Sequence, residues 1–155
     1  MHTRSDYGSP APSPVQAMYR LEEFTEGSGL ERPLLELVKT RVSQINGCAY
    51  CIDMHTKDAR AAGETEQRLY GLSAWRESPY YSERERAALA WAEVVKSLPQ
   101  VYESGEEYEA ARAQFSAEEL VKLTVVVVAI NGWNRQAFAF RESAASYEAS
   151  VSATS

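Results

Sequence analysis

The stretch from Glu36 to His55, ELVKTRVSQINGCAYCIDMH, contains both cysteines of the chain and one of its two histidines. Cys48 and Cys51 form a C-x-x-C pair, and His55 follows four residues after the second cysteine. On a helix, residues three and four apart share one face, with Cβ atoms about 5–6 Å apart. If this segment is helical, the two thiols and the imidazole therefore form one short stripe.

A chain reversal directly precedes the stripe. Asn46-Gly47 is typical of a helix end, because either residue can adopt the left-handed conformation. The sequence thus predicts a helix that ends near Ile45 and a second helix from Cys48 to Ala62, with Gly63 as its terminating glycine. Glu36 lies about three turns before the reversal, so a hairpin of the two helices can bring its carboxylate over the stripe.

These residue types indicate thiol redox chemistry. A free cysteine has a pKa of about 8.5, and both a helix N-terminus and a neighbouring imidazole favour its thiolate. A thiolate that attacks a peroxide O–O bond becomes a sulfenic acid, and a second thiol nearby condenses with it to a disulfide. The helix dipole favours Cys48 as the thiolate, whereas His55 favours Cys51. A hydrogen-bonded partner usually shifts a pKa more than a terminal dipole does, which favours Cys51.

The run Glu36, Cys48, Cys51 and His55, with C-x-x-C-x-x-x-H inside it, is similar to the AhpD-like alkylhydroperoxidases of the carboxymuconolactone decarboxylase superfamily. The resemblance implies that Cys51 becomes the sulfenic acid and that Cys48 donates a proton and then resolves it. It also implies that Glu36 and His55 relay protons. AhpD proper has a second histidine directly before the second cysteine, where this chain has Tyr50.

The likeness extends from about Val15 to Trp91 and returns at residues 131–135, NGWNR. It implies an all-α fold, a compact multi-helix bundle whose helical hairpin carries the cysteines. It further implies a homo-oligomer, trimer or hexamer, that reduces a hydroperoxide without a cofactor and is recycled by an unidentified dithiol or protein reductant.

Other functions remain open at this point. Cys48, Cys51, His55 and Glu36 have the ligand types of a zinc site, although no second C-x-x-C is present. A structural disulfide or a thioredoxin-like domain is less consistent with the absence of an export signal and with the helical flanks. Within the superfamily the alternative enzyme is a decarboxylase of a γ-lactone carboxylate. Outside enzymes it is a non-catalytic oligomeric protein that senses redox state or binds a partner. We expect no metal and no cofactor.

The composition and net charge of the chain limit the kinds of partner that it can bind. A chain of 155 residues with 45% hydrophobic and 25% charged residues is typical of one globular domain. Its net charge of −6 argues against nucleic acid and against anionic membrane surfaces as partners. Because the N-terminus lacks the apolar core of a signal peptide, a cytoplasmic location is expected.

Helical periodicity and breaker residues place the remaining elements. We expect a flexible arm over 1–14, a single helical domain over 15–147 and a frayed tail over 148–155. Ser82 and Ser116 each begin a capping box, with Glu three residues later. The other predicted helices cover 15–24, 33–45, 64–75, 101–114 and 120–140.

Two of these helices have distinct patterns. The helix over 33–45 has the spacing of one buried face. The segment 120–140 contains the β-branched run Thr124–Val128, which favours a strand, yet the capping box before it favours a helix. Because this helix is apolar on nearly every side, we expect it to be buried on every side, against other helices or another subunit. Its NGWNR residues could line the site or hydrogen-bond to neighbouring helices, and we favour the structural role. On the cysteine helix, we expect the polar residues to face solvent: Asp53, Lys57, Asp58 and Arg60.

Overall fold

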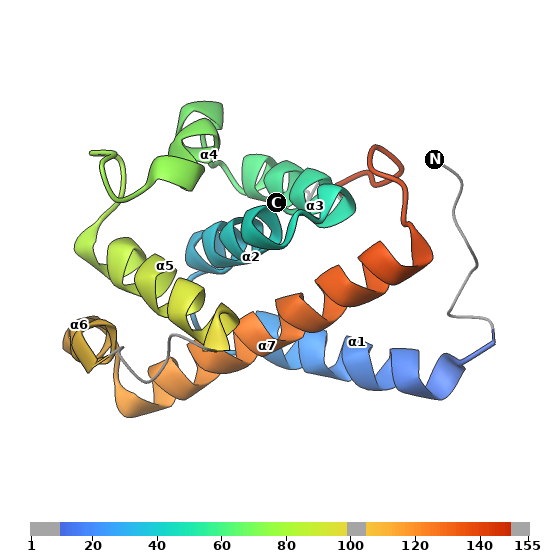
Figure 1. Cartoon of the computed structure of the whole chain (residues 1–155), viewed down its shortest axis with the longest axis horizontal. Coiled ribbons are helices and arrows are strands. Elements are labelled where there is room, and N and C mark those ends of the chain that lie inside the picture. Colours follow the sequence, from blue (N-terminus) through green and yellow to red (C-terminus); the bar gives the residue numbers. More distant parts are fainter. Residues whose placement is uncertain (1–9, 99–104, 150–155) are drawn as a thin grey trace, which may run out of the picture.

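The computed structural model describes residues 10–98 and 105–149. Within these ranges the chain forms seven α-helices and one 3-10 turn and no β-strand, which confirms the predicted all-α bundle (Figure 1). Most of the predicted arm, residues 1–9, and most of the predicted tail, residues 150–155, lie outside the described residues. None of the helices described combines the length and apolarity needed to cross a bilayer.

The first helix, α1 (Pro12–Glu26), begins inside the stretch predicted to be an arm. Proline is favoured in the first turn of a helix, because the N–H that it lacks would have no partner there. The sequence prediction started this helix three residues too late, at Val15. Helix α1 packs against α7 and contributes Tyr19, Glu22 and Glu26 to the pocket described below.

Helix α2 (Arg32–Asn46) is the centre of the bundle (Figure 1). It packs against α3 (Ala49–Ala61), α5 (Glu83–Lys96) and α7 (Ala117–Phe140). Every residue from Leu34 to Thr40 is buried. The prediction of a single buried face was therefore wrong.

Specific partners satisfy three of the four polar side chains that α2 buries; the hydroxyl of the fourth, Thr40, has no hydrogen-bond partner among the described residues. Lys39 is only 2% exposed and its Nζ donates a hydrogen bond to Oε1 of Glu22 on α1. Glu36 pairs with His55 on α3, and Ser43 accepts a hydrogen bond from Asn134 on α7. A buried charge or hydroxyl without such a partner would cost free energy, so these contacts are what allow a partly polar helix to occupy the centre.

Helix α7 begins at the predicted capping box. Ser116 Oγ accepts from the N–H of Glu119, and the Glu119 carboxylate accepts from the N–H of Ser116. These hydrogen bonds, together with one from Arg84, lower the pKa of Glu119 to about 2. The β-branched run that follows is helical despite its strand preference, because it lies within α7, whose capping box and packing against α2 and α5 favour the helix.

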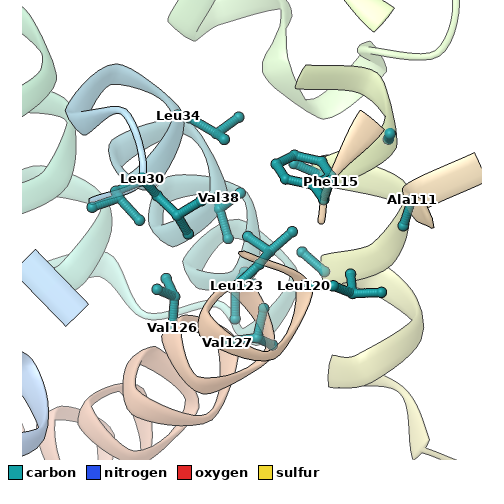
Figure 2. Packing of buried hydrophobic residues seen from close by; sticks show 14 of the residues in the cluster. Leu30, Leu34, Val38, Ala111, Phe115, Leu120, Leu123, Val126 and Val127 are labelled. Carbon is teal, nitrogen blue, oxygen red and sulfur yellow. The ribbon is translucent and has the colours of Figure 1, made fainter. Parts of the chain in front are cut away.

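The predicted burial of α7 on every side is wrong for the single chain. Val121, Val128 and Phe138 are 65%, 55% and 76% exposed. Val121 and Val128 are seven residues apart, about two turns, so they lie on one side of the helix, whereas Phe138 lies about a quarter turn round the helix from them. The opposite side packs into the main core, which Figure 2 shows between α2, α7 and the end of α6 (Gly105–Gln114). That core includes Leu34, Val38, Phe115, Leu123, Val126 and Val127.

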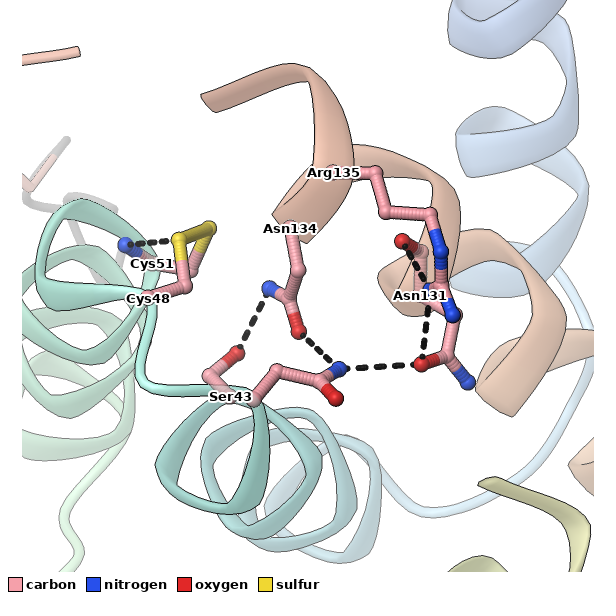
Figure 3. The surroundings of a disulfide bond; sticks show 7 residues. Ser43, Cys48, Cys51, Asn131, Asn134 and Arg135 are labelled. Carbon is pink, nitrogen blue, oxygen red and sulfur yellow. Dashed lines mark hydrogen bonds between the residues drawn. A yellow bond between two sulfur atoms is a disulfide. The ribbon is translucent and has the colours of Figure 1, made fainter. Parts of the chain in front are cut away.

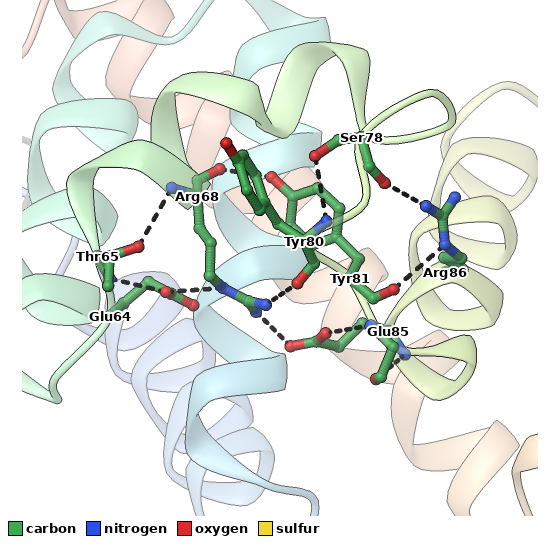
Figure 4. Close-up of polar contacts among 9 residues, drawn as sticks. Glu64, Thr65, Arg68, Ser78, Tyr80, Tyr81, Glu85 and Arg86 are labelled. Atoms are coloured by element: carbon green, nitrogen blue, oxygen red, sulfur yellow. Dashed lines mark hydrogen bonds and ion pairs between the residues drawn. The ribbon is translucent and has the colours of Figure 1, made fainter.

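The segment predicted as one helix over 64–75 is shorter and broken. It forms α4 (Glu66–Gly71) and a 3-10 turn (Leu72–Ala74), and its predicted inward residues, Leu69, Leu72 and Trp75, are buried. Arg68 holds this segment on α5 by donating to Glu64 at 2.8 Å and to Glu85 at 2.5 Å (Figure 4).

Candidate active site

The two cysteines lie at the start of α3, directly after the chain reversal. Gly47 has a left-handed φ of 68° and ends α2, as the sequence predicted. Cys48 is the N-cap residue of α3, and its Sγ accepts a hydrogen bond of 3.3 Å from the backbone N–H of Cys51. The two sulfur atoms are joined as a disulfide (Figure 3). The structure therefore shows the oxidised state of the pair.

Side-chain amides hold α7 against this reversal. Asn46 Nδ2 donates to Oδ1 of Asn131 at 2.9 Å and to Oδ1 of Asn134 at 2.8 Å. Asn134 Nδ2 in turn donates to Ser43 Oγ at 3.0 Å (Figure 3). Ala137, about one turn further along α7, packs against both cysteines. The predicted structural role of the NGWNR segment is confirmed for its two asparagines.

The hairpin brings Glu36 to His55, as its geometry predicted. Glu36 Oε2 lies 2.9 Å from His55 Nδ1, and the two side chains are only 9% and 6% exposed. A neutral imidazole that donates from Nδ1 carries its lone pair on Nε2. Nε2 is buried and has no hydrogen-bond partner among the described residues. The pair is thus arranged to receive a proton at Nε2 while the carboxylate stabilises the resulting imidazolium.

A pocket of about 220 Å³ lies over these groups, and Cys51, His55 and Glu36 all line it. Cys48 is not among the lining residues and is only 4% exposed. Cys51 is itself only 1% exposed, and the pocket is the cavity that it lines. Of the four residues predicted from the sequence, three therefore face the pocket, and Cys48 lies behind Cys51.

The remaining wall of the pocket is aromatic and acidic. The rings of Tyr19 and Trp133 lie 5.2 Å apart, and Trp133 Nε1 donates to Glu22 Oε2 at 3.1 Å. Glu22 also binds Lys39, so the ammonium group in the pocket is already paired. The wall also includes Glu26, Tyr50, Met54, Asp58, Ala137 and Tyr147.

Two tyrosines of the pocket wall, Tyr50 on α3 and Tyr147 after α7, have uncharged hydroxyl groups at neutral pH. Burial raises the pKa of Tyr50, which stands where AhpD proper has a histidine. Burial and the hydrogen bond to Asp58 raise the pKa of Tyr147. An ordinary phenol already has a pKa of about 10, so neither group supplies a negative charge or accepts the proton of a thiol.

Sequence reasoning missed several pocket residues. Asp58 lies three residues after His55, on the same helix face, and this spacing was a usable signal. Trp133 is in the NGWNR segment, for which a place in the site was the less favoured of the two predicted roles. Tyr147 comes from the end of the described chain, and nothing in its local sequence indicates that it returns to α3.

One set of groups in the pocket has the composition of a metal site. Ligand atoms of Glu36, His55 and Asp58 lie within 4.8 Å of one another. Glu36 is paired with His55, and Asp58 accepts a 2.7 Å hydrogen bond from the hydroxyl of Tyr147. A metal ion would have to replace these hydrogen bonds. The cysteines, joined to each other, offer no thiolate ligand in this state. That the protein holds no metal stays a prediction.

Comparison with known proteins supports the family relationship that the cysteine motif indicates. Residues 15–94 match the Carboxymuconolactone decarboxylase family. The uncharacterised protein YdfG of Bacillus subtilis (strain 168) is 44% identical over 146 residues, which is 94% of this chain and 99% of that protein.

Two solved structures share the fold. A protein of unknown function from Agrobacterium tumefaciens, provisionally assigned as the antioxidant defence protein AhpD, is 44% identical with a TM-score of 0.88, over 92% of this chain and 97% of that one. The debrominase Bmp8, solved with 2,3,4-tribromopyrrole, has a TM-score of 0.80 at 18% identity, over 89% of this chain and 74% of that one. At that identity it shows the fold alone. The chain belongs to the carboxymuconolactone decarboxylase family and is an AhpD-like member of it.

Proposed function

We propose that this protein is a thiol peroxidase that reduces hydroperoxides through a cycle between the Cys48–Cys51 dithiol and its disulfide. The observation that carries the proposal is one pocket that holds Cys51 together with the Glu36–His55 pair, with Cys48 directly behind. A nucleophile, a base and a group that orients the base are the parts that activated thiol chemistry requires.

The reaction has two chemical steps. His55 Nε2 takes the proton of Cys51, and the thiolate attacks the terminal peroxide oxygen. The O–O bond breaks, an S–O bond forms, and the alkoxide leaves as an alcohol after it takes a proton from His55. Cys48 then attacks the sulfenic sulfur, water leaves and the disulfide forms. A dithiol donor reduces the disulfide with two electrons and two protons, which completes the cycle.

The charge of the pocket favours this activity over the decarboxylase alternative. Four carboxylates line the pocket, from Glu22, Glu26, Glu36 and Asp58, and its lysine, Lys39, is bound to one of them. A γ-lactone carboxylate would meet net negative charge with no unpaired cation among the described lining residues. These carboxylates do not repel an uncharged hydroperoxide in this way.

A non-catalytic redox sensor would differ from a peroxidase in the rate and the stoichiometry of its reaction with peroxide. A redox sensor would lose two thiols per chain slowly and once, and would not consume further peroxide when a dithiol is added. We expect the reduced protein to lose two thiols after one equivalent of cumene hydroperoxide and to turn over with an added dithiol. Thiol titration measures the loss of thiols, and a peroxide-consumption assay measures the turnover. The Cys48→Ser/Cys51→Ser double variant is the control. Unchanged thiol content would contradict the proposal.

We also propose that the chain assembles as a homo-oligomer, a trimer or a hexamer, through the exposed side of α7. Exposed apolar side chains that share one helix side are typical of subunit contacts, and Val121 and Val128 form such a side. Light scattering at micromolar concentration is expected to give a multiple of the 17.3 kDa chain mass.

A charged substitution locates the contact. Val128→Glu is expected to shift the protein toward monomer, because a carboxylate would be buried without a partner in the interface. Tyr70→Glu is the matched control, since Tyr70 is 70% exposed on α4. A monomeric wild-type protein would contradict the assembly, and an intact oligomer in Val128→Glu would contradict the assignment to α7.

A further inference from the structure

The segment that follows α7 doubles back onto the cysteine helix. Two non-glycine residues in it have positive φ, Arg141 at 56°, which caps α7, and Ala145 at 70°. The left-handed conformation is unfavourable for an alanine, so it persists only where other contacts hold the backbone in place. Figure 1 shows this segment turning from the end of α7 toward α3.

Three side chains of α3 provide those contacts. Asp53 Oδ2 accepts from the N–H of Ala145 at 3.0 Å, and Lys57 Nζ donates to the carbonyl of Tyr147 at 2.7 Å. Asp58 Oδ1 accepts from the hydroxyl of Tyr147 at 2.7 Å. Lys57 and Asp53 also pair with each other at 2.8 Å. We call the segment 143–148, fixed in this way, the C-terminal strap.

These contacts overturn the expectation that Asp53, Lys57 and Asp58 face solvent. All three are half-buried, whereas residues 143–146 of the strap are exposed. The strap therefore buries little apolar surface of its own, and its hydrogen bonds to α3 are what place it. Their effect is to set the half-buried ring of Tyr147 into the wall of the pocket that Cys51 and His55 also line.

We infer that Tyr147 is a specificity-determining residue, which contacts the organic group of a hydroperoxide while the peroxide oxygens lie at Cys51. This inference rests on the proposed peroxidase function and adds a substrate preference to it. The tyrosine hydroxyl is occupied by Asp58, so the ring face is the part of Tyr147 that a substrate can touch. With Tyr19 and Trp133 it gives an aromatic wall suited to an uncharged aryl or alkyl group.

The test compares two peroxides of different size. Reduced full-length protein is mixed with cumene hydroperoxide or with hydrogen peroxide in a single turnover, and the second-order rate of thiol loss is measured for each. Hydrogen peroxide has no organic group and does not reach the wall when it reacts. In Tyr147→Ala, the ratio of the cumene hydroperoxide rate to the hydrogen peroxide rate is expected to fall roughly tenfold, with the hydrogen peroxide rate within about twofold of wild type.

Two variants separate this role from a merely structural one. Tyr147→Phe keeps the ring and the backbone contacts to Asp53 and Lys57, and its ratio is expected to stay within about threefold of wild type. Tyr70→Ala removes an exposed tyrosine far from the pocket lining and should leave both rates unchanged.

The possible failures are distinguishable. Equal loss of both rates in Tyr147→Ala, or an unchanged ratio, would overturn the inference while leaving the peroxidase proposal intact. A wild-type protein that reacts with neither peroxide would overturn both.

Discussion

Cys51→Ser is expected to abolish the reaction of the protein with hydroperoxide, with a fall in rate of at least about 1,000-fold. Cys51 is the cysteine that lines the pocket, and a serine hydroxyl is too weak a nucleophile to replace its thiolate. The measurement is the single-turnover rate of peroxide consumption by the reduced protein.

Cys48→Ser is the matched variant and should behave differently. A sulfenic acid should still form at Cys51, because Cys48 lies behind it and does not line the pocket. Turnover should stop, because no thiol remains to displace water from the sulfenic sulfur. Dimedone trapping and peptide mass spectrometry locate the sulfenic acid. An adduct on Cys48 in Cys51→Ser, with none on Cys51 in Cys48→Ser, would mean that the two roles are reversed.

His55→Gln is expected to slow the first chemical step at pH 7 by about 10²–10⁴-fold, the usual contribution of a general base. His55 presents an unpaired, buried Nε2 beside the pocket, and glutamine offers no atom of comparable basicity. The defect should shrink as the pH rises, because a thiol then ionises increasingly without the help of a base.

Glu36→Gln should give a smaller loss than His55→Gln. An amide oxygen can still accept the hydrogen bond from Nδ1, but it does not stabilise an imidazolium as a carboxylate does. Glu118→Gln is the control, since that side chain is 77% exposed on α7. If His55→Gln reacts at the wild-type rate at pH 7, the proton of Cys51 goes elsewhere and the proposed relay is wrong.

The sequence predicted the local geometry of the cysteine hairpin well, because short-range signals determine it. Gly47 reverses the chain, and the spacing from Cys51 to His55 places both on one face of α3. The approach of Glu36 to His55 follows from the antiparallel hairpin. The catalytic roles of these residues stay predictions until the variants above are measured.

The sequence underestimated the burial of α2, and the burial predicted for α7 on every side does not hold within the single chain. Periodicity counts apolar residues, and α2 buries Glu36 and Lys39 with partners on other helices that no local pattern reveals. α7 is more apolar but presents one side to solvent in the single chain. The return of Tyr147 to α3 was missed for a similar reason, since its hydrogen bonds join residues about 90 positions apart.

The position of Cys48 as N-cap of α3 links the redox state to the mobility of the first helical turn. Its sulfur accepts the amide proton of Cys51, a proton that has no partner within the helix. A disulfide sulfur is a weak acceptor, whereas a thiolate is a strong one. When Cys48 ionises to attack the sulfenic acid at Cys51, its sulfur should therefore hold this amide hydrogen more strongly than the disulfide does and slow its exchange with solvent. The first turn of α3 would then be tightest just before the disulfide forms and looser once it has formed, so one backbone hydrogen would respond to the state of the cysteine pair.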